Sequence, residues 1–136
     1  MRIVICGSMT FANQMISYKK KLQNLGHQVF ISPLAKDYIS GKRKKGPEEL
    51  SAKRKIDALK LYFQEIKKSD AILVLNYKHK NINGFIGGNT LIEMGFAHVL
   101  GKKIYLLNKP SKKLDYLTEI LFMEPIILER KIKNLV

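Results

Sequence analysis

The sequence has one cysteine and no tryptophan, and none of its apolar runs approaches the length of about 18 residues that a membrane-spanning helix needs. Cys6 has no partner for an internal disulfide. At the end of an apolar strand we expect it to be a small buried thiol rather than a nucleophile or a metal ligand. Apolar residues begin almost directly after Met1, so we expect no signal peptide and a cytoplasmic protein. A chain of 136 residues fits a single domain spanning residues 1–136.

Two common phosphate-binding fingerprints are also missing. The sequence contains neither GxGxxG nor GxxxxGK followed by Ser or Thr, which disfavours ordinary NAD and ATP sites, and we expect no cofactor. The three histidines, His27, His79 and His98, are far apart, and no cysteine or second histidine lies near them at the spacing of metal ligands. We therefore expect no metal site.

Acidic residues are scarce: 11 Asp and Glu stand against 25 Lys and Arg, for a net charge of +14. Such a charge suits a partner that carries phosphate, whether a nucleotide or a nucleic acid. The lysines are scattered through every segment, and aromatic residues are not interleaved with them as a single-strand binding platform requires. The basic run at residues 42–45 lies between glycines, and it is interpreted as a solvated loop, with a phosphate clamp as the alternative.

Short apolar runs alternate with helical patterns along the whole chain. This alternation predicts an α/β fold, a small doubly wound five-stranded parallel sheet of flavodoxin- or Rossmann-like order 2-1-3-4-5, with helices on both faces. Gly26 and Gly101 each follow a predicted helix as C-terminal caps do. The expected strands cover residues 3–6, 29–31, 71–75, 104–107 and 125–128, and the expected helices cover 13–25, 49–68, 87–100 and 114–122, with a polar loop over 33–49.

The segment 87–97 is the most informative piece of the chain. Gly87 and Gly88 at a loop-to-helix junction let the backbone approach a ligand, and the free N–H groups of the first helical turn attract anions or sugar oxygens. Glu93 then lies one turn inside as a candidate catalytic carboxylate. The alternative is a capping box, in which Glu93 reaches back to the Thr90 N–H. In a sheet of this order the ligand crevice lies beyond the carboxyl ends of strands one and three.

The chain contains Ile-Cys-Gly-Ser at residues 5–8, Ser-Asp-Ala at 69–71, the segment with Glu93 at 88–97, and Gly-Lys-Lys at 101–103. In this order and spacing, these motifs resemble the nucleoside 2-deoxyribosyltransferase superfamily, and the resemblance spans most of the chain. It implies that Glu93 is the nucleophile that attacks the anomeric carbon of the sugar. The start of the chain is also similar to the branch of this superfamily that hydrolyses 2′-deoxynucleoside 5′-monophosphates. This similarity implies that Ser8 contacts the phosphate, and the alternative is that Ser8 is an ordinary turn hydroxyl.

The implied chemistry is physically reasonable. A glycosidic C–N bond breaks through an oxocarbenium-like state that a nearby carboxylate can stabilise or trap. Donors at the helix N-terminus can orient the sugar hydroxyls around Glu93. The candidate substrate-binding residues, all on loops at the predicted crevice, are Gly7, Ser8, Phe11, Asn76, Gly87, Gly88 and Asn89.

Two acidic residues of the transferase branch have no counterpart here. The position eight residues before Asp70 holds Tyr62, and the loop 78–83 contains neither Asp nor Glu. Tyr62 or His79 is then the candidate proton donor to the leaving base, although Tyr62 is equally suited to a core position. Asp70 is interpreted as a polar residue at the entrance to the third strand.

These features predict an enzyme that cleaves or transfers the N-glycosidic bond of a nucleoside, a deoxynucleoside or its 5′-monophosphate. The missing acids leave open a nucleotide-binding or sensing module with weak or lost catalysis, and the basic surface leaves open a nucleic-acid-binding protein. The resemblance implies a homodimer or a larger homo-oligomer, and no membrane partner is expected.

Overall fold

A computed structural model of the chain describes residues 1–39 and 48–135. It contains one five-stranded sheet of order β2-β1-β3-β4-β5 in which every neighbouring pair is parallel, as the alternating pattern predicts. The basic run at residues 42–45 lies outside the described residues. The strands are β1 (Arg2–Cys6), β2 (Gln28–Phe30), β3 (Ala71–Val74), β4 (Lys103–Leu106) and β5 (Ile126–Ile127). The helices are α1 (Ala12–Asn24), α2 (Ala35–Ile39), α3 (Glu48–Lys67), α4 (Gly88–Val99) and α5 (Leu117–Phe122), with the 3₁₀ turns η1 (Met9–Phe11) and η2 (Ile132–Asn134).

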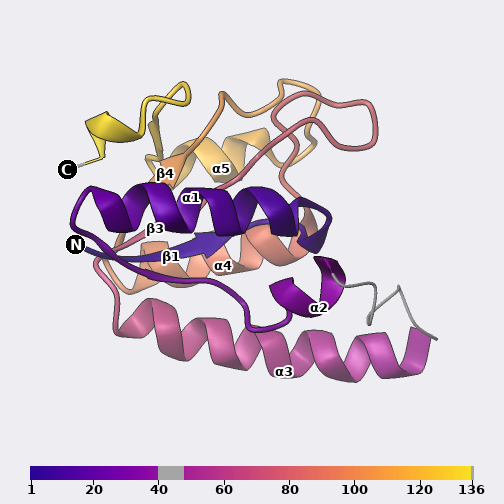
Figure 1. Cartoon of the computed structure of the whole chain (residues 1–136). Helices are drawn as coiled ribbons and strands as arrows, with labels where there is room; N and C mark the ends of the chain where they lie inside the picture. The colour runs from indigo at the N-terminus through magenta and orange to yellow at the C-terminus, as the bar shows by residue number, and fades with distance from the viewer. Residues whose placement is uncertain (40–47, 136) are drawn as a thin grey trace.

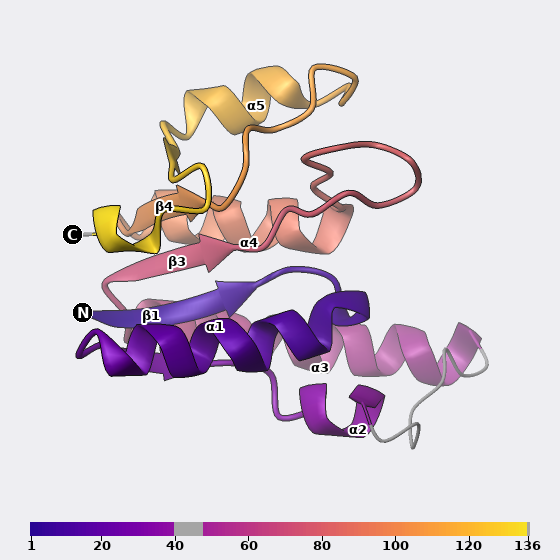
Figure 2. The ribbon, with the colours of Figure 1, turned by 45° about the horizontal axis from the view of Figure 1, so that its top comes forward.

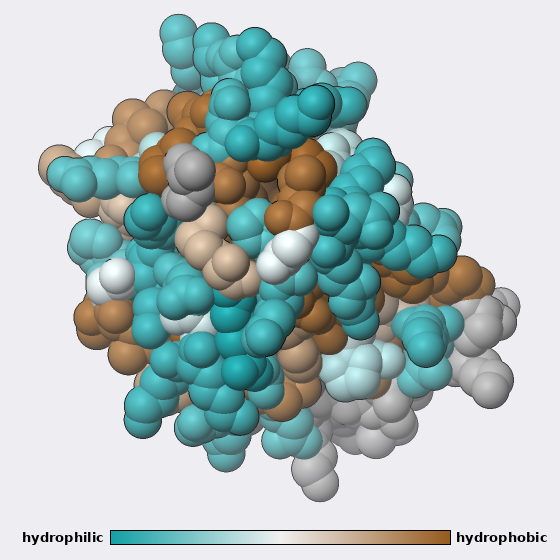
Figure 3. All heavy atoms as spheres, turned by 60° about the vertical axis from the view of Figure 1, so that its left-hand side comes forward, coloured by the Kyte–Doolittle hydropathy of each residue, from teal (hydrophilic) through white to brown (hydrophobic). Residues whose placement is uncertain are grey.

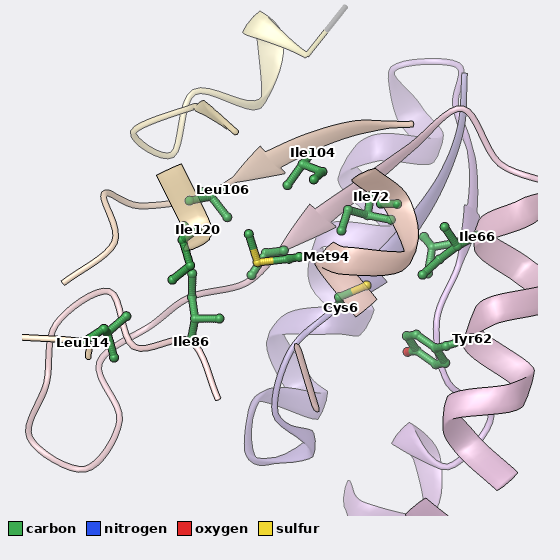
Figure 4. Packing of buried hydrophobic residues seen from close by; sticks show 13 residues of the cluster. Cys6, Tyr62, Ile66, Ile72, Ile86, Met94, Ile104, Leu106, Leu114 and Ile120 are labelled. Carbon is green, nitrogen blue, oxygen red and sulfur yellow. The ribbon is translucent and has the colours of Figure 1, made fainter. Parts of the chain in front are cut away.

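Helices cover both faces of the sheet, with α1 on one face and α3 and α4 on the other (Figures 1 and 2). Alternate residues of each strand point to opposite faces, so the central strands are buried on both sides. Figure 4 shows the layer between the sheet and helices α3 and α4. Its buried side chains include Val4, Cys6, Tyr62, Ile66, Ile72, Met94, Ala97 and Leu106, and the opposite layer includes Ile3, Ile5, Met15, Leu22, Leu73 and Tyr105.

The chain leaves β1 and β3 toward opposite faces of the sheet. β1 and β3 are neighbours, with Cys6 opposite Val74 at their carboxyl ends. After β1 the chain enters α1 on one face, and after β3 it enters α4 on the other. In sheets of this kind the strand order reverses at such a pair, so the region beyond these two strand ends is the predicted place for a ligand.

Three local predictions differ from the structure. The polar loop over 33–49 contains α2, which starts where the Leu34 and Ala35 N–H groups donate to the Oγ and carbonyl oxygen of Ser32. Strand β5 has two residues instead of four: the Leu128 N–H still donates to the Leu106 carbonyl oxygen, but the chain then enters the turn at Glu129 and Arg130, which ends the regular pairing. Helix α5 begins later than residue 114, because Leu114 belongs to a turn in which its carbonyl oxygen accepts from the Leu117 N–H.

Two predictions on helix ends are confirmed, and one alternative is wrong. Gly26 and Gly101 follow α1 and α4 with positive φ angles of 93° and 71°. The capping box is wrong, because α4 begins at Gly88 with Gly87 as its N-cap. Thr90 thus lies inside the first turn, and Glu93 lies in the second turn, beyond reach of a capping role.

Polar side chains spread over most of the face shown in Figure 3, with hydrophobic patches between them. A few large apolar side chains are exposed, including Val99 at 84% and Phe122 at 76%. Within residues 1–39 and 48–135, no helix is both long and apolar enough to cross a membrane. The expected homo-oligomer stays a prediction.

Gly84 joins the loop after β3 to the segment after β4, which makes it a sensitive test of the loop structure. It has a φ of +71°, and a Cβ there would lie 2.0 Å from the Lys109 carbonyl oxygen. We expect Gly84→Ala to lower the free energy of unfolding by about 3 kcal/mol or more in urea titrations, because it combines backbone strain with a steric clash. Gly101→Ala is the matched control: its φ is also +71° but nothing lies within 4 Å, so about 1 kcal/mol is expected. Equal losses would show that the two loops do not meet at Gly84.

Candidate active site

Glu93 is a buried carboxylate without a protein partner. Its side chain lies in the second turn of α4 and is 7% exposed. No residue of the described chain forms a hydrogen bond or an ion pair with it. In the same described residues, every fully buried side-chain oxygen or nitrogen has a hydrogen-bond partner. The unpartnered oxygens of Glu93 therefore keep a small contact with solvent.

Burial raises the pKa of Glu93 from 4.5 to about 8. The cause is desolvation, because the charged form loses its hydration without gaining a compensating donor. Burial and, second, the Glu93 charge raise the pKa of the Cys6 thiol, so Cys6 is close to the carboxylate. Cys6 is fully buried, as predicted, and it adds no donor that the carboxylate uses. Glu93 thus changes protonation near neutral pH, where both acid and nucleophile chemistry are accessible.

Tyr62 lies close to the same carboxylate but is occupied by the backbone. Burial, then Cys6 and Glu93, raise the pKa of its phenol. The hydroxyl donates to the Ile5 carbonyl oxygen at 3.1 Å and accepts from the Ser32 N–H at 3.1 Å. Figure 4 shows the ring projecting from α3 into the core layer. These contacts favour the core interpretation of Tyr62, which ties α3 to the ends of β1 and β2, over a role as proton donor.

The loop after β1 approaches the end of β3 closely. Gly7 has a φ of +153°, and a Cβ there would lie 3.3 Å from the Leu75 carbonyl oxygen. The Ser8 hydroxyl accepts from the Thr10 N–H at 3.2 Å and donates to the Thr10 Oγ1 at 3.0 Å, so it caps η1. Both contacts correspond to the turn hydroxyl that the sequence left open for Ser8. Contact with a phosphate stays a prediction.

Aromatic rings from two loops form a cluster at this edge of the sheet, here called the aromatic cluster: Phe11, Tyr77, His79 and Phe85. The Phe11 ring centroid lies 5.1 Å from that of Tyr77 and 6.1 Å from that of His79, and His79 lies 5.2 Å from Phe85. A Cβ at Gly87 would lie 3.5 Å from the Phe85 ring, so the cluster adjoins the start of α4. The sequence singled out Phe11 and His79 but missed Tyr77 and Phe85, whose only signal was their place in the loop after the third strand.

The N-terminus of α4 is open. Gly87 is an N-cap without a side-chain hydrogen bond, and Gly88 and Asn89 are exposed. The N–H groups of the first turn have no partner within a helix. A Cβ at Gly88 would meet nothing within 4 Å, so space lies above this helix end. Free donors and open space suit a polar ligand such as a sugar or an anion.

Asn76 is a connector between strand ends. Its side chain is 1% exposed; the amide nitrogen donates to the Asn108 carbonyl oxygen at 2.7 Å, and its oxygen accepts from the Asn108 N–H at 2.9 Å. The Asn108 amide donates in turn to the Asn76 carbonyl oxygen at 3.2 Å. These bonds hold the loops after β3 and β4 together, so Asn76 positions the site rather than presenting its own amide to a ligand.

Metal ligands do not gather in the part of the chain that the structure describes, where no three His, Cys, Asp or Glu side chains lie close enough together to hold an ion. His27 lies at the opposite end of the sheet, with Nδ1 3.0 Å from the N-terminal amine. Asp70 also lies at that end and accepts from the Arg2 N–H at 2.8 Å, as its interpretation at the entrance of β3 predicts.

Comparison with solved structures finds a protein of the same fold. The CMP N-glycosidase BcmB of Clostridium botulinum is similar to this chain with a TM-score of 0.54 and 21% sequence identity, over 93% of this chain and 84% of that chain. No protein-family model and no curated protein matches the sequence. The likeness shows a shared α/β architecture across almost the whole chain.

The structure gathers most of the predicted site residues at one sheet edge. The loop after β1 supplies Gly7, Ser8 and Phe11, and the start of α4 supplies Gly87, Gly88 and Asn89, with Glu93 buried one turn further along. Tyr62 and Asn76 lie beside this group with their polar atoms bonded to the protein. The aromatic cluster and the open N-terminus of α4 together suit a flat, partly polar ligand, and the Glu93 carboxylate lies one turn along the same helix.

Proposed function

We propose that the protein is an enzyme that cleaves or transfers the N-glycosidic bond of a nucleoside or of its 5′-monophosphate, with Glu93 as the nucleophile. The observation that carries the proposal is the Glu93 carboxylate, buried without a hydrogen bond or ion pair to any described residue beside an open helix N-terminus. Burying such a group unpaired costs stability, and strongly shifted pKa values are typical of functional sites. The fold shared with a CMP N-glycosidase supports the same class of reaction.

In this reaction the ionised Glu93 attacks the anomeric carbon. The C–N bond breaks with its electron pair passing to the base, which takes up a proton, and a glycosyl ester forms at Glu93. Water then hydrolyses the ester, or an acceptor base attacks it. With a pKa of about 8, roughly a tenth of the free protein carries the ionised form at pH 7, and a positively charged sugar at the transition state favours that form further.

The aromatic cluster is the proposed place for the base. Phe11, Tyr77 and Phe85 offer ring faces or edges against which a heterocycle packs. His79 lies between Phe11 and Phe85 and is the proposed proton donor to the leaving base, because the Tyr62 proton is already donated to the Ile5 carbonyl oxygen.

A second candidate is a nucleotide-binding module without efficient turnover. The observation that favours it is the chemistry of the loop after β3: residues 76–86 contain no carboxylate to relay a proton to the base. The aromatic cluster and the open helix N-terminus would then bind a nucleotide, and Glu93 would remain as a neutral hydrogen-bonding carboxyl group.

Incubation of the protein with a panel of ribo- and deoxynucleosides and their 5′-monophosphates separates the two candidates. We expect chromatography to detect free base from at least one substrate, because the buried carboxylate can trap the sugar. An added second base distinguishes transfer, which yields a new nucleoside, from hydrolysis. Calorimetric binding of a monophosphate with no base released from any member of the panel would favour the module and overturn the enzyme.

A further inference from the structure

A cleft adjoins the aromatic cluster, because Lys78, which lines it, lies between Tyr77 and His79 in the chain. It has a volume of about 500 Å³ and is formed by the loop after β3 together with the segments after β4 and β5. Figure 2 shows the loops after β3 and β4 side by side, and the Ser111 N–H donates to the Gly84 carbonyl oxygen at 3.1 Å between them. This region, here called the basic cleft, is lined by Lys78, Asn83, Gly84, Asn108, Lys109, Glu129 and Arg130.

Arg130 is held in place before any ligand binds. Its Nε donates to the Asn108 Oδ1 at 3.1 Å, and its guanidinium carbon lies 5.4 Å from the centre of the Tyr77 ring. Asn108 is itself fixed by its hydrogen bonds to Asn76. The bond through Nε leaves the terminal guanidinium N–H groups for a ligand. A planar cation with a fixed plane suits the paired oxygens of a phosphate.

The backbone at this position has an uncommon conformation. Glu129 and Arg130 are consecutive non-glycine residues with positive φ angles of 49° and 64°. The Arg130 N–H donates to the Leu107 carbonyl oxygen at 2.9 Å, which ties this turn to the end of β4. Such conformations cost free energy and recur at ligand sites. Here the turn brings the Arg130 side chain back over Tyr77.

The cleft has an excess of positive charge. Lys78, Lys109 and Arg130 stand against a single acid, Glu129, whose Oε1 lies 3.4 Å from the Lys109 Nζ. Both side chains of this pair are more than half exposed, so the pair contributes little to stability and an anion can displace the carboxylate. The volume is in the range of small-molecule sites, so the cleft has room for more than one phosphate.

We propose that the basic cleft is an anion site that binds a phosphoryl group, with Arg130 as the paired donor and Lys78 and Lys109 as point charges. The phosphoryl group has two sources: free phosphate, or the phosphate of a nucleotide whose base occupies the aromatic cluster across Tyr77. The second source rests on the proposed function, whereas the first does not. Binding is measured without turnover, so failure of the cleft and failure of the glycosidic reaction are separate results.

The test is a titration of the protein with inorganic phosphate. Binding is monitored during the titration by nuclear magnetic resonance, through the arginine Nε–H and asparagine amide signals. We expect Arg130→Ala to weaken phosphate binding by about tenfold or more, and Lys109→Ala by several-fold. Glu129→Gln should tighten it by roughly threefold, because it removes the competing carboxylate. Lys20→Ala is the matched control: it removes the same charge from an exposed position on α1, and it should change the dissociation constant by less than about twofold.

A matched nucleoside and nucleoside 5′-monophosphate, titrated in the Glu93→Gln background to prevent turnover, identify the source. A monophosphate that binds more tightly than its nucleoside, with the gain lost in Arg130→Ala, assigns the cleft to the nucleotide phosphate. Equal binding of the two, with inorganic phosphate still sensitive to Arg130, assigns it to free phosphate. If Arg130→Ala and Lys20→Ala weaken the binding of phosphate, or of an oligonucleotide, by the same factor, the binding depends on the overall positive charge and the proposal is overturned. Absence of phosphate binding in the wild type would overturn it as well.

Discussion

Glu93→Gln is expected to slow release of free base by about a thousandfold or more while leaving nucleotide binding within a few-fold of the wild type. Glutamine has nearly the same shape as glutamate and preserves the packing of this side of α4, but its amide cannot form the glycosyl ester. Because the side chain is buried without a partner in the described chain, the substitution breaks no hydrogen bond that holds the fold. Single-turnover chromatography of the base, combined with calorimetric titration of the nucleotide, measures both quantities.

Glu119→Gln is the control for this variant, since Glu119 is exposed on α5 and the substitution is the same exchange of a carboxyl group for an amide. It should retain the wild-type rate. The pH profile adds an independent check. A nucleophilic Glu93 makes the rate rise with pH up to about 8, as the carboxylate ionises. A rate that instead falls as pH rises through this value would assign Glu93 as an acid and contradict the nucleophile assignment.

The sheet was predictable because its strands are buried on both faces. Ile3–Cys6 and Ala71–Val74 are continuous apolar runs, and such runs separated by helical patterns leave a parallel sheet as the main solution. For the strand order 2-1-3-4-5, right-handed crossovers then determine which face of the sheet each helix covers. The fold class is confirmed. Strand β5 was overpredicted because the Pro125–Leu128 run is apolar, whereas its pairing length depends on where the next turn begins.

The site was predictable only where a local pattern marks it. The two glycines at the start of α4 and the carboxylate in its second turn have a fixed relation along the helix, so their relative position follows from the sequence. Arg130 and Asn108 had no such signal. Their hydrogen bond joins residues 22 positions apart, and it depends on the turn at Glu129 and on the Asn76 bridge. Contacts of this kind arise from tertiary packing, which no spacing rule encodes.

The role of Tyr62 also could not be predicted from the sequence. Its position was interpreted in two ways, as a proton donor replacing a missing acid or as a core residue of the helix before β3. The sequence could not decide between these because both place the ring on the inner face of α3. The bonds of its hydroxyl to Ile5 and Ser32 depend on the distance between α3 and the sheet, which is a property of the packed layers.

Glu93→Gln is also expected to stabilise the protein at neutral and alkaline pH. The pKa of Glu93 is about 8 in the folded chain against 4.5 as the ordinary value, so between these pH values the folded state holds a proton that the unfolded state has released. Stability of the wild type therefore falls as pH rises through this window, by about 1.4 kcal/mol per pH unit. Glutamine does not titrate, so the variant does not lose this part of its unfolding free energy as the pH rises. At pH 7 we expect the variant to be more stable by roughly 3 kcal/mol in urea titrations.

The difference between the two proteins should disappear at pH 4, below the ordinary pKa of the carboxyl, because Glu93 is then protonated in both states. The free energy of unfolding of both proteins is therefore measured at pH 4, 7 and 9. The pH 4 value serves as the reference for each protein, and the contributions of all other titrating groups cancel in the difference between the two proteins. A carboxylate that had a strong donor would behave in the opposite way, and its replacement by glutamine would destabilise the protein above pH 4. That outcome, or equal stabilities at all three pH values, would mean that Glu93 is not an unpartnered buried acid, and the main support for its catalytic role would be lost.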